Sequence, residues 1–216
     1  MIKMIATDLD GTLLRHNKSI SRYTASVLRR CIEQGIKIVF ATARPIRAVR
    51  MLDIPVAFEA LICHNGAVID VGNENIFRFG IPPQSIQGII SVALQNDAQA
   101  RICIEINDTV YGNSDASDIW PGIEMNLTDF SDLPFMPADK IILLTADMHR
   151  LEAIRRALPE NLYLETSENT LGMVMHKDAT KMNAIKQLCE LFSLSPDDVA
   201  AFGDDYNDIK CLNTVA

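Results

Sequence analysis

Short, mostly apolar runs alternate along this chain with longer segments whose apolar residues recur three or four positions apart. The runs have the length and composition of strands that are covered on both faces, and they lie at residues 2–7, 36–41, 60–63 and 199–202. The helical patterns lie at residues 21–33 and 180–192. Strands that alternate with helices favour a parallel sheet with right-handed crossovers. The sequence therefore predicts an α/β fold with a Rossmann-like parallel-sheet core.

A second unit is expected to begin where Gly80, Pro82 and Pro83 interrupt this pattern. Beyond them the sequence predicts, in order, a helix, two strands, a helix and a strand. These elements are expected at residues 85–94, 101–106, 140–145, 151–158 and 162–165. This order is typical of a small α+β domain.

The domain boundaries follow from the two patterns together. Residues 112–139 are rich in Asp, Asn, Ser, Pro and Gly, so we expect loops there with one short strand at 125–127. The buried-strand pattern resumes only near the C-terminal end of the chain. We therefore predict a core formed by residues 1–81 and 173–216, split around an inserted domain at 82–172.

Polar side chains follow each predicted core strand at its C-terminal end, which is where ligands bind in open α/β sheets. They are Asp8 and Asp10, then Thr42 and Arg44, then Asn65, and finally Asp204, Asp205 and Asp208. Alternate residues of a strand point to the same side, so two carboxylates at such an end repel each other, and a bound cation keeps both anionic. Gly11 lets the backbone turn sharply behind them. We expect a ligand site at this edge of the sheet.

The acidic segment after the last predicted strand can be interpreted from its backbone geometry and its spacing. Gly203 permits a tight exit from the strand, and Asp204 and Asp208 lie about one helical turn apart. This spacing favours metal chemistry for these two residues. For Asp205 we favour a simpler role, stabilisation of a helix start by its charge.

Composition narrows the classes of partner. The chain has 216 residues with 48% hydrophobic and 22% charged residues, which describes a folded protein. Its formal net charge of -8 argues against nucleic acid and against an anionic membrane surface as partners. No apolar run approaches the ~20 residues needed to span a bilayer, and no sorting signal is recognisable. The five cysteines have no metal-ligand spacing, which favours reduced thiols in a cytoplasmic protein.

Four segments, taken in order, resemble the motifs of the haloacid dehalogenase superfamily. They are Asp8-Leu9-Asp10-Gly11-Thr12, Ala41-Thr42-Ala43-Arg44, Lys181 near a helix start, and Gly203-Asp204-Asp205-Tyr206-Asn207-Asp208. The large insertion after the second motif, with Asn65-Gly66-Ala67 ahead of it, resembles the Cof-type phosphatase branch and its α/β (type IIB) cap. The inserted domain would accordingly be the cap.

The resemblance implies a role for each motif residue. Asp8 would be the nucleophile that forms an aspartyl phosphate, and Asp10 the general acid and base. Mg²⁺ would be held by the Asp8 carboxylate, the Asp10 backbone carbonyl and Asp204, with Asp208 and Asn207 completing or orienting the shell. The phosphate- or substrate-binding residues would be Thr42, Ala43, Arg44, Asn65 and Lys181.

Some of these residues also have simpler interpretations. Thr42 could cap the helix expected near Pro45, and Lys181 alone would be an ordinary solvated helix lysine. Asn65 is first of all a turn residue, expected to lead into a strand at 67–69. Arg44 could bind substrate or only bridge the core to the cap.

The chain departs from the family pattern at three points. Ala43 and Met182 stand where relatives usually have glycine, and the chain ends at Ala216, soon after the fourth motif. Relatives continue there with a further strand and helix. We therefore expect the C-terminal edge of the core to be truncated and its last strand to be less protected.

The resemblance predicts a cytoplasmic, magnesium-dependent phosphatase that acts on a small phosphorylated metabolite such as a sugar phosphate. Two alternatives stay open at this point. One is a mutase-like enzyme that transfers the phosphoryl group to an acceptor other than water, since that reaction also uses an aspartyl phosphate. The other is a phosphometabolite-binding protein whose turnover was lost with the C-terminal segment. The sequence does not indicate an oligomeric state.

Overall fold

The computed structural model describes residues 1–145, 147–167 and 171–213. Its internal contacts divide the chain into two compact units. Unit 1 consists of Met1–Arg78 together with the chain from Asp178 onward, and unit 2 consists of Phe79–Lys177. Within the described residues, none of the helices combines the length and the apolar character that a bilayer crossing requires.

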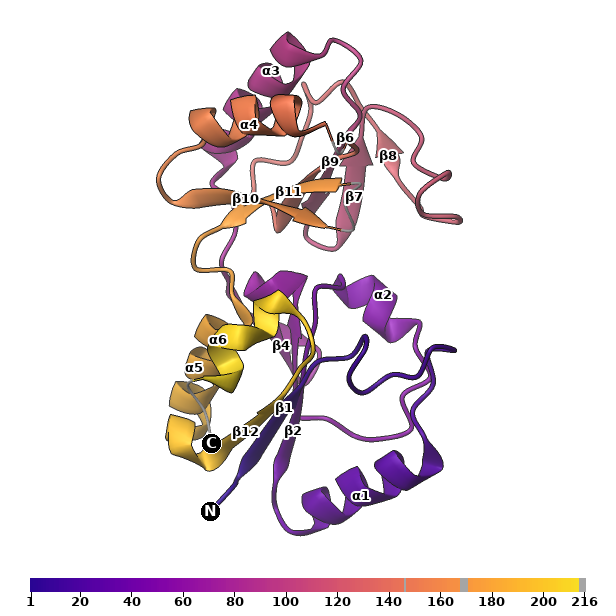
Figure 1. Ribbon diagram of the computed structural model, residues 1–216, viewed down its shortest axis with the longest axis vertical. Coiled ribbons are helices and arrows are strands. Elements are labelled where there is room, and N and C mark those ends of the chain that lie inside the picture. Colours follow the sequence, from indigo (N-terminus) through magenta and orange to yellow (C-terminus); the bar gives the residue numbers. More distant parts are fainter. Residues whose placement is uncertain (146, 168–170, 214–216) are drawn as a thin grey trace. The chain divides into compact units, whose positions relative to one another are not determined.

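Unit 1 is built on a six-stranded sheet in the order β12-β1-β2-β3-β4-β5 (Figure 1). The strands are β1 (Met4–Thr7), β2 (Lys37–Ala41), β3 (Ala60–Cys63), β4 (Val68–Val71), β5 (Glu74–Arg78) and β12 (Val199–Phe202). β1 lies between β12 and β2 and pairs with both in parallel, and β2 pairs with β3 in parallel. These four strands form the predicted parallel core, and β12, from the far end of the chain, lies at its edge.

β4 and β5 extend the parallel core with antiparallel strands, and β4 contains most of the strand expected at 67–69. β4 pairs antiparallel with β3, and β5 pairs antiparallel with β4, so the sheet is mixed. The two strands are joined by Gly72 and Asn73, both with positive φ (62° and 69°), as in a two-residue type I′ hairpin. Residues 74–76 of β5 are exposed, and this edge position explains why the segment lacks the apolar pattern of a core strand.

Helices cover both faces of this sheet. Figure 1 shows α1 (Arg22–Glu33) on one face and α5 (Lys181–Phe192) on the other. Both begin at capping residues, because Ser21 accepts a hydrogen bond from the Thr24 amide and Thr180 accepts one from the Asn183 amide. The apolar side of α5 packs on β1, β2 and β3, where the buried cluster includes Met4, Val39, Ile62, Ile185 and Leu188. Two short helices, α2 (Ile46–Arg50) and α6 (Ile209–Leu212), complete the unit.

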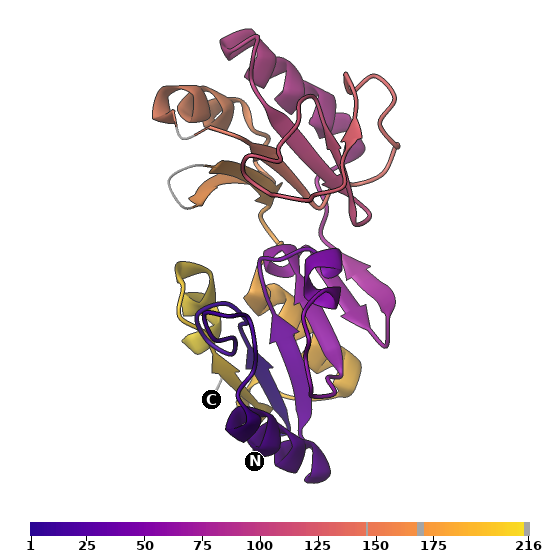
Figure 2. The ribbon, with the colours of Figure 1, turned by 90° about the vertical axis from the view of Figure 1, so that its right-hand side faces the viewer.

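Unit 2 contains a second six-stranded sheet, in the order β10-β11-β9-β6-β7-β8. Its strands are β6 (Ile102–Ile106), β7 (Thr109–Gly112), β8 (Asn126–Leu127), β9 (Lys140–Leu143), β10 (Leu162–Ser167) and β11 (Leu171–His176). Two helices, α3 (Pro83–Asn96) and α4 (Met148–Ala157), lie on one face of it (Figure 2).

The predicted order of elements in this unit was incomplete, because β7 and β11 were not expected. β7 returns along β6 after a tight turn in which Asn107 and Asp108 both have positive φ. β11 pairs antiparallel with both β10 and β9. Turn residues with positive φ precede β7, so the sequence did carry a hairpin signal for that strand.

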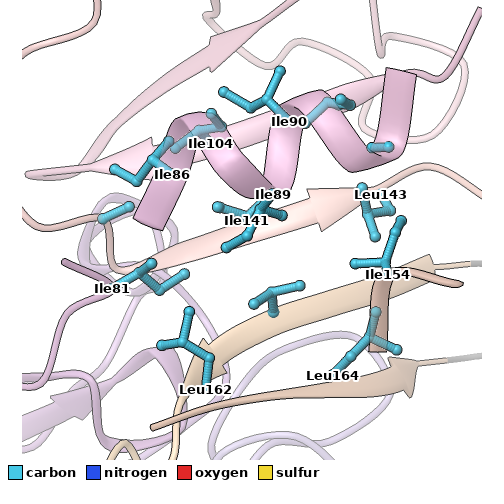
Figure 3. Packing of buried hydrophobic residues seen from close by; sticks show 14 of the residues in the cluster. Ile81, Ile86, Ile89, Ile90, Ile104, Ile141, Leu143, Ile154, Leu162 and Leu164 are labelled. Carbon is cyan, nitrogen blue, oxygen red and sulfur yellow. The ribbon is translucent and has the colours of Figure 1, made fainter. Parts of the chain in front are cut away.

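The core of unit 2 lies between its helices and its sheet. Figure 3 shows Ile86, Ile89 and Ile90 of α3 packed towards Ile104 of β6 and Ile141 of β9, and all five are at least 96% buried. Alternate residues of a strand point to opposite faces. Cys103 and Ile142, which neighbour Ile104 and Ile141 in the same strands, therefore lie on the other face of the sheet. They form a smaller apolar cluster there with loop residues such as Ala116.

Candidate active site

The polar residues predicted at the strand ends do come together at one edge of the unit 1 sheet. Asp8 directly follows β1, and its amide donates to the Phe202 carbonyl at 2.9 Å, which continues the pairing with β12. Thr42 follows β2, and its amide donates to the Ile62 carbonyl at 2.9 Å. Because the four parallel strands run in the same direction, their carboxyl ends bring the first, second and fourth motifs to the same place.

At the centre of the site a buried lysine bridges two buried carboxylates. The Lys181 ammonium lies 2.6 Å from Asp8 Oδ1 and 2.8 Å from Asp208 Oδ1. The exposed fractions of the three residues are only 1%, 6% and 3%. Charges buried to this degree are tolerated only when they are paired and hydrogen-bonded. Lys181 is therefore not an ordinary solvated helix lysine. Its positive charge allows the two carboxylates to be buried.

The electrostatics of Asp8 reflect two opposing influences. Burial raises the pKa of the Asp8 carboxyl above its ordinary value, and the charge and hydrogen bond of Lys181 pull that pKa down again. Asp208 nearby adds a smaller influence that raises it. The contact with Lys181 thus favours the anionic form of Asp8.

Gly66 helps to set the position of Lys181. Its φ is +108°, and a Cβ placed on it would lie 2.3 Å from the Thr180 carbonyl oxygen. Thr180 is the N-cap of α5, directly before Lys181. The turn after β3 and the start of α5 can therefore approach this closely only because residue 66 has no side chain.

Gly66→Ala is expected to lower the free energy of unfolding by roughly 2–4 kcal/mol, since it combines an unfavourable φ with a backbone clash. Urea denaturation would measure it. Gly35→Ala is the control for φ alone, because φ is +80° there and no atom lies within 4 Å. Gly88 is exposed on α3 and a Cβ there would have no atom within 4 Å, so Gly88→Ala should leave the free energy of unfolding unchanged or raise it. Equal losses in Gly66→Ala and Gly35→Ala would contradict the role of the close approach.

Asp10 lies in a different environment, partly exposed and held by two cations. Arg44 donates from Nε to Asp10 Oδ2 at 2.5 Å and from Nη2 to Oδ1 at 2.8 Å, while Lys18 Nζ lies 2.7 Å from Oδ1. The hydrogen bonds from Arg44, with a further contribution from Lys18, lower the pKa of Asp10 to about 2. Arg44 thus forms a two-pronged contact with a carboxylate, the geometry for which guanidinium is suited.

Asp204 is placed by the turn of the first motif. The Thr12 hydroxyl donates to Asp204 Oδ1 at 2.7 Å. A Cβ on Gly11, whose φ is +81°, would lie 2.1 Å from Asp204 Oδ2. The carboxylate therefore lies directly over the backbone at Gly11. This close contact is possible only because residue 11, directly after Asp10, has no side chain.

The second motif and the residues after β3 form a hydrogen-bonded group beside these charges. The Thr42 hydroxyl accepts from the Arg44 amide at 3.2 Å, and the Thr42 carbonyl accepts from the Asn65 amide at 3.0 Å. Thr42 does not cap α2, whose N-cap is Pro45. Asn65, in the left-handed conformation with φ 58°, accepts from Asn207 Nδ2 at 3.0 Å. Among the described residues, buried Asn207 Oδ1 has no hydrogen-bond partner.

The donor atoms at this edge fit a magnesium ion in their chemistry. The carboxylates of Asp8 and Asp204 and the carbonyl of Asp10 are hard oxygen ligands, the kind that Mg²⁺ prefers. In the described part of the chain, no three or more His, Cys, Asp or Glu side chains are grouped as a preformed metal cage. Asp208 has both oxygens engaged, one by Lys181 and the other by the Asp205 amide at 3.3 Å.

Two residues at this edge had no assigned role from sequence. Thr12 lies in the first motif, and Lys18 lies outside all four motifs. Thr12 could have been identified, since a hydroxyl follows the glycine of an acidic turn. For Lys18 there was no signal, because a single lysine in a loop is ordinarily a solvated residue.

The sequence is similar to known proteins over almost its whole length. The sequence profile of the haloacid dehalogenase-like hydrolase family matches residues 5–216. A relative from Mycoplasma pneumoniae is 30% identical over 244 residues, which cover 99% of this chain and 84% of the relative. The HMP-PP phosphatase of Cronobacter sakazakii is 28% identical, with 99% and 81% covered. The 5-amino-6-(5-phospho-D-ribitylamino)uracil phosphatase of Bacillus subtilis is 22% identical, with 97% and 84% covered.

Solved structures share the fold over almost the whole chain. A structure from Eubacterium rectale superposes with a TM-score of 0.89 at 23% identity, covering 99% of this chain and 85% of that one. A HAD subclass IIB sugar phosphatase superposes with a TM-score of 0.82 at 21% identity, covering 99% and 85%. The chain therefore belongs to the haloacid dehalogenase-like hydrolase family, in which it is a Cof-type phosphatase.

Proposed function

We propose that this phosphatase hydrolyses monoesters of small phosphorylated metabolites through an aspartyl phosphate on Asp8, with Mg²⁺ as its cofactor. The observation that carries the proposal is the buried contact of Lys181 with Asp8 and Asp208. A carboxylate that is held anionic at a ligand-binding edge, beside a second carboxylate that is partly exposed, is equipped for nucleophilic and acid–base chemistry.

In the first half-reaction, an Asp8 oxygen would attack phosphorus while the bond from phosphorus to the leaving oxygen breaks. Asp10 would give a proton to that oxygen, so that the leaving group departs as an alcohol. Because Arg44 and Lys18 lower the pKa of Asp10 in the substrate-free site, this step would require the bound substrate to displace these cations from the Asp10 carboxylate. The covalent product is the phosphoryl group bound to Asp8. Lys181, Thr42 and the backbone of Ala43 would hold the phosphoryl oxygens, where negative charge must be balanced.

In the second half-reaction, Asp10 would take a proton from a water molecule as the water oxygen attacks phosphorus. The bond between phosphorus and Asp8 breaks, and inorganic phosphate is released. Mg²⁺, held by Asp8, Asp204 and the Asp10 carbonyl, would neutralise charge on the phosphoryl oxygens. Asp208 would orient Lys181, and Asn207 and Asn65 would orient the site from the side of β3.

The names of relatives support a small phosphometabolite as substrate, since they include an HMP-PP phosphatase, a phosphoribitylamino-uracil phosphatase and a sugar phosphatase. Within this class we propose a sugar phosphate or a close analogue. We assign unit 1, Met1–Arg78 with the chain from Asp178 onward, to the catalytic core, and unit 2, Phe79–Lys177, to the cap, which would select the leaving group.

Phosphate release is expected to depend on Mg²⁺. Removal of the metal with EDTA should lower the rate by roughly 10²-fold or more, and excess Mg²⁺ should restore it. The measurement is inorganic phosphate released from a panel of sugar phosphates, nucleotides and vitamin phosphates, with circular dichroism to show that EDTA leaves the fold intact. An unchanged rate in EDTA would contradict the proposal. Transfer of phosphate to an added sugar phosphate in preference to water would identify a phosphotransferase instead.

A further inference from the structure

The chain returns from unit 2 to unit 1 through a very short connection that ends at Lys181. β11 ends at His176, and Lys177 still belongs to unit 2, where its amide donates to the Asn161 carbonyl at 2.9 Å. α5 begins at Lys181. Residues 178–180 are therefore all that separates unit 2 from the lysine at the centre of the site. A movement of the last residues of unit 2 would reach this lysine unless the connection is held in place.

The connection is tied to the first turn of α5 by three hydrogen bonds. The Asp178 carbonyl accepts from the Thr180 amide at 2.8 Å and from Asn183 Nδ2 at 3.1 Å. The Thr180 hydroxyl accepts from the Asn183 amide at 3.1 Å. Ala179, between the two acceptors, is fully buried. Asn183 thus holds the connection twice, through its backbone at Thr180 and through its side chain at Asp178, and we call these three residues the linker clamp.

The linker clamp leads directly into a tightly packed part of unit 1. The Thr180 carbonyl oxygen lies only 2.3 Å from the place that a Cβ on Gly66 would occupy. The next residue, Lys181, is 1% exposed and contacts two carboxylates. A displacement of about 1 Å in a group that holds the reacting atoms can lower a rate by about 10²-fold. The start of α5 therefore has to stay in place when the connection is pulled.

We propose that Asn183 is a positioning residue for Lys181, a role that rests on the proposed function of Lys181 in holding the phosphoryl group. The side-chain amide of Asn183 fixes the Asp178 carbonyl to α5, so that movement along the connection is absorbed at the backbone torsions next to Lys177. Lys181 then keeps its contacts. A purely structural role, in which Asn183 only stabilises the start of the helix, would not require its side-chain donor.

Asn183→Asp separates the two roles. Residue 183 is the third residue of α5, where a negative charge and a side-chain acceptor favour the helix, so the variant should unfold at the same or a higher urea concentration than the wild type. The new carboxylate has no proton to donate to the Asp178 carbonyl, and the linker clamp is lost. We expect kcat for 4-nitrophenyl phosphate in the presence of Mg²⁺ to fall about fivefold. KM should stay within about twofold, because Lys181 acts chiefly on charge in the transition state.

Three further variants show whether the amide donor is responsible. Asn183→Ala also removes the donor and should show the same loss of kcat. Asn183→Gln keeps an amide donor and should recover most of the activity. Asn96→Ala is the matched control, because it removes the same kind of bond in α3, from Asn96 Nδ2 to the Val92 carbonyl at 2.8 Å. It should keep the kcat and KM of the wild type.

Hydrogen exchange measures the linker clamp without any substrate. In Asn183→Ala the Asp178 carbonyl is held to α5 only through the Thr180 amide, so residues 177–181 should exchange about fivefold faster than in the wild type. Residues 184–192, which form the rest of α5, should keep their protection. Mass spectrometry of peptides from these two segments gives both values.

The outcomes distinguish this proposal from the one on which it rests. A wild-type kcat in Asn183→Asp and Asn183→Ala, an equal loss in Asn96→Ala, a lowered urea midpoint in Asn183→Asp, or unchanged exchange at 177–181 would overturn the role of Asn183. Each of these results leaves the proposed function intact. A wild-type protein that releases no phosphate in the presence of Mg²⁺ would overturn both.

Discussion

Asp8→Asn is expected to abolish phosphate release, with kcat lowered by roughly 10³-fold or more, while the protein remains folded. The substitution keeps the shape of the side chain but replaces the nucleophilic carboxylate by a neutral amide, which does not attack phosphorus. It also removes one of the two carboxylates that Lys181 contacts, and the contact with Asp208 at 2.8 Å remains to pair the buried ammonium. The loss should therefore appear in kcat, and the free energy of unfolding should change little.

The measurement is single-turnover phosphate release, together with mass spectrometry of the acid-quenched enzyme to detect a phosphorylated aspartate. The wild type should show the added phosphoryl group, and Asp8→Asn should not. Asp197→Asn, which changes an exposed aspartate in the same way, is the control and should be fully active. Asp8→Ala guards against slow conversion of the introduced asparagine back to aspartate. Activity that survives in both Asp8 variants would remove Asp8 from the role of nucleophile.

Lys181→Met is expected to be the most destabilising single change at the site, lowering the free energy of unfolding by about 3–5 kcal/mol. Methionine matches the length of lysine but leaves Asp8 and Asp208 buried together without a cation. The contact and charge that lower the pKa of Asp8 are lost, so this pKa should rise further above its ordinary value. Any protein that folds should then have a partly protonated nucleophile and little activity at neutral pH.

Urea denaturation of Lys181→Met beside Lys186→Met measures this effect, since the second lysine lies on the exposed side of the same helix. The double variant Lys181→Met/Asp208→Asn is a more stringent test of the same ion cluster. Removing one carboxylate as well relieves part of the repulsion, so the double variant should lose less stability than the two single losses added together. Strict additivity, or a loss in Lys181→Met no larger than in Lys186→Met, would contradict the buried ion cluster.

Much of the unit 1 fold could be predicted from the chain, because core strands and helices carry strong local patterns. The apolar runs that became β1, β2, β3 and β12 are buried on both faces, so almost every position in them is constrained to be apolar. The helical patterns at residues 21–33 and 180–192 became α1 and α5, whose N-caps are Ser21 and Thr180. In both units, antiparallel strands were missed. β5 at the sheet edge is partly exposed, and β7 has only four residues. β11 is longer, and it pairs with β9 as well as with β10.

By itself the sequence determined which residues stand at the carboxyl ends of the parallel strands. Asp8, Asp10, Thr42 and Asp204 were identified from position and spacing, because the direction of a parallel strand dictates where its following residue lies. The resemblance to a phosphatase family rested on the same residues. The sequence did not indicate which of these residues contact one another.

Only the tertiary structure decided the electrostatic partners. Lys181 pairs with Asp8, which is 173 residues away, and Lys18 meets Asp10 through a turn that no sequence pattern distinguishes from a solvated loop. Gly66 proved necessary because Thr180, from a distant segment, approaches its backbone. Local patterns report which face of an element is buried. The pairing of a charge depends on which other segment is packed against it, and that is settled only when the whole sheet and its helices are assembled.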